Sequence, residues 1–174
     1  QNEKAKQKAY QEVIADADKF EALDGSYASD KVAETAKAVL AASATDFSKD
    51  DVSEVVAGIK NGKIIGFVVT VVAHDGYGGD IQITVGIMSD GTVNGISFLS
   101  ISETAGLGMR AKEPSFYNQF AGQQAEKFYV SKDGGDGQPI DALSGATITS
   151  RAVTGAVNTA LGYYQTALGG SGNE

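Results

Sequence analysis

Apolar and polar residues alternate through the middle of the chain, and this period of two is typical of β-strands. Residues 54–75, EVVAGIKNGKIIGFVVTVVAHD, contain two such stretches separated by Asn61-Gly62, a dipeptide that strongly favours a tight hairpin turn. Residues 80–103, DIQITVGIMSDGTVNGISFLSISE, repeat the arrangement around Asp90-Gly91. The segment HDGYGGD between them predicts a glycine-rich loop. The pattern therefore predicts four strands in an antiparallel meander.

Helical spacing of apolar residues is found on both sides of this meander. The first such stretch runs from Tyr10 to Phe20 and follows a polar lead-in formed by residues 1–9. The other expected helices are one from Lys31 to Ala42, a short one that opens near Pro114, and a last one from about Ser150 to Leu168. Residues 126–141, EKFYVSKDGGDGQPID, predict a further strand that runs into an acidic, glycine-rich loop.

These elements predict a single α+β domain in which helices flank an antiparallel sheet of two consecutive hairpins plus a further strand. A chain of 174 residues is long enough to bury a proper core. We expect a helical lead-in over residues 1–24, the folded domain over residues 25–168 and a flexible tail over residues 169–174.

Composition and charge exclude several classes of function. The formal net charge of −8 argues against nucleic-acid binding and against polybasic attachment to anionic lipid. The absence of cysteine excludes disulfides, thiolate metal sites and cysteine nucleophiles. The longest apolar run, IIGFVVTVVA, is shorter than the roughly 20 residues that span a bilayer. Because the sequence begins with Gln1, we expect that an upstream segment was removed, such as a membrane anchor or a signal peptide.

Residues 141–153, DALSGATITSRAV, place four hydroxyl side chains around one glycine, directly before the last expected helix. The hydroxyls belong to Ser144, Thr147, Thr149 and Ser150. A glycine turn that leads into a helix presents free N–H groups and the positive end of the helix dipole, which suits a phosphate group. The alternative is that Thr149 or Ser150 merely caps the helix, and on the local pattern alone this is the commoner arrangement.

Three other segments contain candidate chemistry. In residues 102–113, SETAGLGMRAKE, Gly106 and Gly108 permit close backbone approach to a ligand and Leu107 could press on a flat ring, although a plain loop is the simpler interpretation. His74 is the only histidine, and a serine hydrolase is disfavoured because Ser144 does not lie in a G-x-S-x-G motif. The aspartates of KDGGDGQPID do not have EF-hand spacing, so we expect a solvated loop rather than a calcium site.

Two of these segments match the signatures of one known family. DALSGAT at 141–147 fits the flavinylation motif D-x-x-S/T-G-A-T/S at every position, and ETAGLG at 103–108 is similar to E-T-P-G-L-G, with Ala105 in place of proline. Over roughly residues 55–168 the chain therefore resembles the FMN-binding domain family. Within that family, GYGGDIQITVGI at 76–87, KDGGD at 132–136 and GATITSRAV at 145–153 resemble the G subunits of Rnf complexes, which are membrane-bound, ion-translocating ferredoxin:NAD oxidoreductases.

The resemblance implies a cofactor, FMN, and a role for each matching residue. Thr147 would carry FMN through a phosphodiester to its hydroxyl, which a flavin transferase of the ApbE type would install. That transferase would read Asp141, Ser144, Gly145 and Ala146. The isoalloxazine ring would be lined by Glu103, Thr104, Leu107 and Gly108, and Tyr77 and Thr149 would belong to the same site. We expect no catalytic side chain and no metal.

The same resemblance implies partners and a location. The domain would relay electrons as a redox subunit among the other subunits of an Rnf complex, without turnover of its own. A single N-terminal membrane helix, removed from this sequence, would anchor it on the extracytoplasmic side of the cell membrane. The acidic surface predicts weak, salt-sensitive docking to neighbouring subunits.

Other functions remain open at this point. One is a stand-alone flavinylated electron-transfer domain, and another is the C subunit of the sodium-pumping NADH:quinone reductase, which shares both signatures. A third is non-covalent binding of FMN or another phosphorylated ligand, and a fourth is an interaction module without a cofactor.

Overall fold

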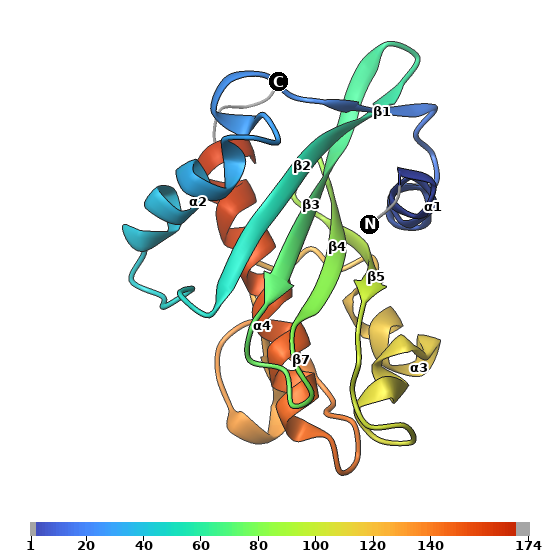
Figure 1. Cartoon of the computed structure of the whole chain (residues 1–174), viewed down its shortest axis with the longest axis vertical. Helices are drawn as coiled ribbons and strands as arrows, with labels where there is room; N and C mark the ends of the chain where they lie inside the picture. The colour runs from blue at the N-terminus through green and yellow to red at the C-terminus, as the bar shows by residue number, and fades with distance from the viewer. Residues whose placement is uncertain (1–2, 170–174) are drawn as a thin grey trace.

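A five-stranded antiparallel sheet forms the centre of the protein in a computed structural model, which describes residues 3–169. The strands follow the chain order β1-β2-β3-β4-β5 (Figure 1). Their bounds are β1 Lys19–Ala22, β2 Asp50–Lys60, β3 Lys63–Ala73, β4 Ile81–Met88 and β5 Val93–Ser100. The α+β class and the antiparallel meander predicted from the sequence are thus confirmed.

Both predicted hairpin turns are present. Between β2 and β3, Asn61 and Gly62 have φ angles of 52° and 78°, the left-handed conformation at both positions that a type I′ turn requires. Gly91 in the second turn has a φ of 90°. The local turn chemistry therefore determines where the strands reverse.

Helices cover both faces of the sheet (Figure 1). On one face α4, Thr147–Tyr163, packs on β3 and β4, and α2, Val32–Ala41, packs on β2 and α4. The larger hydrophobic cluster on this face includes the alternate β4 residues Ile81, Ile83, Val85 and Ile87. On the other face α1, Glu3–Val13, forms a smaller cluster that includes Val56 and Val68. Burying one such aliphatic side chain contributes about 1.5–3 kcal/mol to stability. Because successive side chains of a strand point to opposite faces, the position of each residue in the strand determines which helix its side chain contacts.

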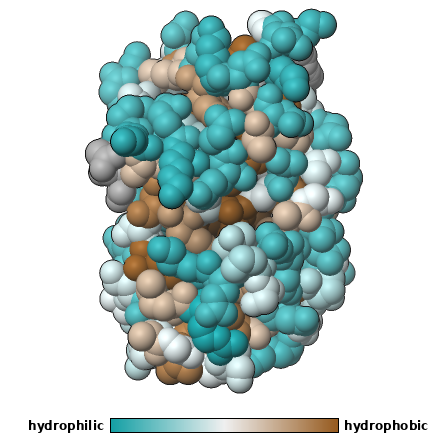
Figure 2. Space-filling model, turned by 90° about the vertical axis from the view of Figure 1, so that its right-hand side faces the viewer, coloured by the Kyte–Doolittle hydropathy of each residue, from teal (hydrophilic) through white to brown (hydrophobic). Residues whose placement is uncertain are grey.

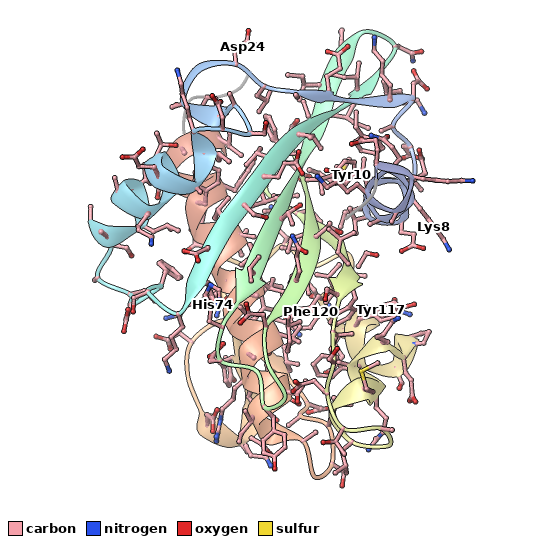
Figure 3. The ribbon with its side chains drawn as sticks, viewed as in Figure 1. Lys8, Tyr10, Asp24, His74, Tyr117 and Phe120 are labelled. Atoms are coloured by element: carbon pink, nitrogen blue, oxygen red, sulfur yellow. The ribbon has the colours of Figure 1, made fainter. Side chains whose placement is uncertain are left out.

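The prediction of one helix from Tyr10 to Phe20 was wrong. α1 already begins at Glu3 and ends at Val13, and Phe20 lies on β1, where it pairs with Gly58 of β2. Tyr10 points from α1 toward the sheet and its hydroxyl donates to Glu54 (Figure 3). Phe20 pairs with Gly58 in the sheet, and its ring packs on Tyr10 with the centroids 5.5 Å apart, so these two contacts hold it as a strand residue.

The helix predicted from Lys31 to Ala42 is confirmed as α2, and the one near Pro114 as α3, Pro114–Tyr117. α4 begins three residues before the expected Ser150 and continues as a π-helical turn, Tyr164–Leu168. Short 3₁₀ helices cover Gly25–Tyr27, Gly108–Lys112, Asn118–Phe120 and Ser131–Asp133.

The strand expected in residues 126–141 does not join the main sheet. β6, Phe128–Val130, pairs in parallel with β7, Gln138–Ile140, in a separate two-stranded sheet, and β1 is the fifth strand of the main sheet. No helix within residues 3–169 has the length and apolar character needed to cross a bilayer. Residues 1–2 of the expected lead-in and 170–174 of the expected tail lie outside the described residues, and the boundaries at 24 and 168 stay predictions.

Candidate functional site

Four loops meet at one end of the molecule, the lower end in Figure 1. They are residues 74–80 between β3 and β4, 101–107 after β5, 131–137 between β6 and β7, and 141–146 before α4. Side-chain hydrogen bonds link all four to one another or to the first turns of α4. The two motifs that resemble family signatures, at residues 103–108 and 141–147, therefore lie at the same end of the domain.

A pocket of about 570 Å³ opens between three of these loops and the start of α4, and residues 131–137 do not line it. It is lined by Tyr77, Thr104, Leu107, Gly108, Gly145, Ala146, Thr147, Ile148 and Thr149. All of these except Ile148 were predicted from the sequence as site residues. Ile148 was not predicted, and the only feature of the sequence that could have indicated it is its position next to Thr147.

Exposed hydrophobic side chains gather around this pocket. Among the described residues four large hydrophobic side chains are exposed, and three of them, Tyr77 at 70%, Leu107 at 41% and Ile148 at 48%, line its walls. Such a concentration of apolar surface typically marks a binding site.

Thr147 is the first residue of α4 and lies half-buried at the pocket. Its Oγ1 accepts a hydrogen bond of 3.0 Å from the ammonium group of Lys132. The preceding Gly145 has a φ of +74°, a conformation that glycine adopts without strain. The hydroxyl is therefore presented at the start of a long helix, beside a positive charge.

The interpretation of Thr149 or Ser150 as the helix cap was wrong. The N-cap of α4 is Ala146, which has no side chain able to cap, and both hydroxyl residues lie within the helix. Ser150 Oγ donates to the Ala146 carbonyl and accepts from the Leu143 amide, whereas Thr149 Oγ1 donates to Glu103. These hydroxyls hold the turn against the helix.

Glu103 lies behind the pocket and does not line it. Its side chain is buried and accepts three hydrogen bonds, from the Tyr77 amide at 2.9 Å, the Gly78 amide at 2.6 Å and the Thr149 hydroxyl. Because these donors come from the 74–80 loop and from α4, the one carboxylate joins three segments of the site. We expected Glu103 to line the ring site, whereas in the structure it lies behind the pocket wall.

Gly108 is required for packing as much as for the pocket. A Cβ at this position would lie 2.5 Å from Thr149 Oγ1 and 2.6 Å from the Cβ of Glu103. Gly106, by contrast, has a φ of +77°, and a Cβ added there would have no neighbour within 4 Å. The close approach that the sequence suggested for Gly108 is therefore partly an approach to the protein's own side chains.

Ser144 and Asp141 lie beside the pocket rather than in its lining. Both are exposed. The Ser144 carbonyl accepts from Arg110, and the Asp141 backbone is bound on both its N–H and its C=O by the Gln119 side chain. Asp141 borders a separate hollow of about 240 Å³, which lies outside the 570 Å³ pocket.

The acidic loop near Thr147 is fastened to α4 by an ion pair. Arg151 donates to both oxygens of Asp133, at 2.8 Å and 2.6 Å. The hydrogen bond from Arg151 lowers the pKa of Asp133, and the same bond raises the pKa of Arg151. Within residues 3–169 no cluster of three or more histidine, aspartate or glutamate side chains could hold a metal ion.

His74 has a structural position at the base of the 74–80 loop (Figure 3). Its Nε2 lies 2.7 Å from Asp51 and its Nδ1 lies 3.0 Å from Asp80. The hydrogen bonds to Asp51 and then Asp80 raise the pKa of His74. With both ring nitrogens engaged by carboxylates, this side chain ties the loop to the sheet and is not arranged as a base for a nucleophile.

A second hollow, of about 600 Å³, lies between α1, β5 and residues 117–121. It contains none of the site residues predicted from the sequence. Figure 2 faces this side of the molecule and shows hydrophobic residues at mid-height among mostly hydrophilic ones. The chemistry-bearing motifs therefore single out the pocket at Thr147.

The fold and the pocket together define a cofactor-binding domain, and the comparison with known proteins identifies its class. The FMN-binding domain family matches residues 76–162, half of the chain, and the chain belongs to this family. The matched range includes both motifs and every residue that lines the pocket. FMN, the cofactor expected from the sequence, is thereby confirmed.

The similar curated proteins are subunits of ion-translocating complexes. The G subunit of the Na⁺-translocating ferredoxin:NAD⁺ oxidoreductase complex of Acetobacterium woodii is 38% identical over 67% of this chain and 57% of its own length. The G subunit of the proton-translocating ferredoxin:NAD⁺ oxidoreductase complex of Clostridium ljungdahlii is 41% identical over 66% of this chain and 61% of its own. The chain thus spans little more than half of the length of these relatives.

Two solved structures share the fold. NqrC of Shewanella oneidensis superposes with a TM-score of 0.52 at 26% identity, over 67% of this chain and 58% of that one. The C subunit of the Na⁺-translocating NADH-quinone reductase of Parabacteroides distasonis gives a TM-score of 0.55 at 23% identity, over 69% of this chain and 63% of that one. The second likeness bears on the fold alone.

The residues of the pocket fit FMN. Its volume of about 570 Å³ lies within the range of about 300–1,000 Å³ that small-molecule sites occupy. At Thr147 the lining offers a hydroxyl and the N-terminus of α4 for the phosphate, and the Lys132 ammonium binds the same hydroxyl from outside the lining. The walls offer Leu107, Ile148 and Tyr77 for a flat aromatic ring.

Proposed function

We propose that this domain carries FMN in a covalent bond to Thr147 and relays electrons as the G subunit of a membrane-bound, ion-translocating Rnf complex. The observation that carries the proposal is the position of the Thr147 hydroxyl. It lies at the start of α4, beside Lys132 and at the wall of an apolar pocket, within a complete flavinylation motif.

The attachment step needs an activated flavin nucleotide in which FMN is held by a phosphoanhydride bond, as in a flavin dinucleotide. The Thr147 Oγ1–P bond forms, the anhydride P–O bond breaks, the adenosine monophosphate leaves and the hydroxyl proton is released to solvent. The product is a phosphodiester with one negative charge, which the N-terminus of α4 stabilises. No histidine or cysteine is needed for the linkage.

Along the walls of the pocket, side chains orient the ring. Leu107 and Ile148 present aliphatic surface, and Tyr77 presents an aromatic face from the 74–80 loop. Bound FMN supplies the reversible electron acceptance, while the protein contributes attachment, orientation and electrostatic environment. Glu103 acts through the backbone of Tyr77 and Gly78, whose loop it holds in place.

A flavin transferase of the ApbE type would recognise the exposed side of the 141–147 segment. Asp141 and Ser144 are both exposed there, outside the pocket that would hold the flavin, so an external enzyme can reach them. The similarity to G subunits of ferredoxin:NAD⁺ oxidoreductase complexes supports the other partners, the subunits of an Rnf complex. A membrane anchor N-terminal to this domain, with the domain on the extracytoplasmic side, completes the proposal.

The proposal is tested by mass spectrometry of denatured protein that has been co-produced with a flavin transferase. We expect the peptide containing Thr147 to be heavier by one FMN less one water. Thr147→Ala should abolish this added mass, and Thr45→Ala, which removes an exposed hydroxyl outside both the motif and the pocket, should retain it. Flavin that separates from the wild-type chain on denaturation would instead indicate non-covalent binding, and a colourless protein would indicate a domain without cofactor.

A further inference from the structure

We propose that Lys132 is the positioning residue for the phosphoryl group at Thr147, and that the loop 131–137 exists to deliver its ammonium group there. This inference rests on the proposed covalent attachment of FMN. It starts from the 3.0 Å hydrogen bond that Lys132 Nζ donates to Thr147 Oγ1, the oxygen that would become the bridging oxygen of the ester.

The loop that carries Lys132 is held against α4 at two points. On one side of Lys132, the Asn158 side chain of α4 binds both the N–H and the C=O of Phe128, each at 2.8 Å. On the other side, Asp133 is held by the two-pronged ion pair with Arg151. With its flanks fixed to the helix that begins at Thr147, Lys132 has a defined position relative to the hydroxyl.

Lys132 has no ion-pair partner in the described part of the chain, and besides its bond to Thr147 its charge makes only a minor contribution to lowering the pKa of Asp133. The protein as a whole is acidic, yet the neighbouring Asp133 is already neutralised by Arg151. An exposed lysine loses side-chain entropy when it is held in one conformation. A hydrogen bond to one neutral hydroxyl compensates poorly for this loss of entropy. A phosphodiester on the same oxygen would provide the negative charge that the ammonium group lacks as a partner.

The position of Lys132 gives it one role before the flavin is attached and a second role afterwards. Before attachment, the hydrogen bond orients the Thr147 hydroxyl and places a positive charge where the incoming phosphoryl oxygens must lie. After attachment, the ammonium can bind a non-bridging oxygen of the ester, a charge-assisted contact that the unmodified protein lacks. Lys132 therefore affects both the rate of attachment and the stability gained from it.

The experiment compares Lys132→Gln with Lys132→Arg and with Lys127→Gln, an exposed lysine just before β6 for which the structure gives no contact with Thr147. Purified apoprotein is incubated with a flavin transferase and flavin adenine dinucleotide, and covalent flavin is followed by fluorescence of the denatured protein. We expect Lys132→Gln to slow incorporation about tenfold or more, as loss of one charge-assisted hydrogen bond implies. Lys132→Arg should recover much of the rate, and Lys127→Gln should match the wild type.

A second readout separates positioning from a merely structural role. The melting temperature of each variant is measured before and after flavin attachment, at low and at high salt. We expect the rise on attachment to be larger in the wild type than in Lys132→Gln, with the difference shrinking at high salt. Equal apoprotein melting temperatures show that the substituted loop remains folded.

The outcomes distinguish this inference from the function on which it rests. If Lys132→Gln accepts flavin on Thr147 at the wild-type rate and gains the same stability, the role of Lys132 is refuted while covalent attachment stands. If Lys132→Arg is as slow as Lys132→Gln, the positive charge is not the cause and the inference is also refuted. If the wild-type chain accepts no flavin at Thr147, the proposed function fails and the inference fails with it.

Discussion

Glu103 offers the sharpest test of how the site is held together, through the substitution Glu103→Gln. The substitution keeps the shape of the side chain and replaces one carboxylate oxygen by an NH₂ group. The carboxylate accepts from the Tyr77 amide and the Thr149 hydroxyl on one oxygen and from the Gly78 amide on the other. Glutamine can keep at most the first two, and its NH₂ group then faces the Gly78 N–H as a second donor.

The magnitude follows from these contacts. A hydrogen bond to a charged group contributes about 1.5–3 kcal/mol and a neutral one about 0.5–1.5 kcal/mol. Three bonds of the first kind become at most two of the second, and the Gly78 N–H loses its partner. Even after allowing for the lower desolvation cost of the neutral amide, we expect the free energy of unfolding to fall by about 3 kcal/mol.

The assay is urea unfolding of the apoprotein followed by circular dichroism, together with hydrogen exchange of the Tyr77 and Gly78 amides. Glu113→Gln is the matched control, because Glu113 is exposed and should change stability by less than about 0.5 kcal/mol. We expect Glu103→Gln to lose protection at both amides. A loss of less than about 1 kcal/mol with unchanged protection would refute the view that this carboxylate holds the loops together.

Two further substitutions test packing and pH dependence. Gly108→Ala places a methyl group 2.5 Å from Thr149 Oγ1, so we expect the free energy of unfolding in urea to fall by about 1–3 kcal/mol. Gly95→Ala is the control, because a Cβ there has no neighbour within 4 Å and should not show this cost. Equal effects of the two substitutions would contradict the packing argument. Burial, aided by Asp75, raises the pKa of Asp50 to about 6, although a hydrogen bond from Thr159 opposes the change. Because this folded pKa lies above the ordinary value of 3.8, the contribution of Asp50 to stability is complete below about pH 4 and is lost as the pH rises through 6. The difference corresponds to at most about 3 kcal/mol, so the stability of Asp50→Asn relative to the wild type should rise between about pH 4 and pH 6 and level off above that, in thermal or urea unfolding. A pH-independent difference would show that burial of this charge is not the cause.

Much of the fold could be predicted from the sequence because its causes are local. Asn61-Gly62 turns the chain through its own backbone preferences, and the alternation of β4 places Ile81 to Ile87 on one face whatever packs there. The loops 103–108 and 141–147 could likewise be identified, since their motifs resemble family signatures and both lie within the matched family range. The prediction that they share one site needed only that resemblance.

Other features were decided by contacts between residues far apart in the chain. Phe20 has helical spacing from Tyr10 and Val13, yet it is a strand residue because it pairs with Gly58 of the distant strand β2. Residues 128–130 have the composition of a strand but pair with β7 rather than with the main sheet. A local pattern describes what a segment can form, and the available partner determines what it does form.

The site shows the same division. By itself the sequence determined the attachment turn, the glycines and the hydroxyl that could carry a phosphate. Only the tertiary structure placed Lys132 beside Thr147, turned Glu103 toward the Tyr77 and Gly78 amides, and left Asp141 outside the pocket. The physical reason is that a hydrogen bond depends on the distance and direction between two groups, and for residues on different loops these are set by the packing of the whole domain.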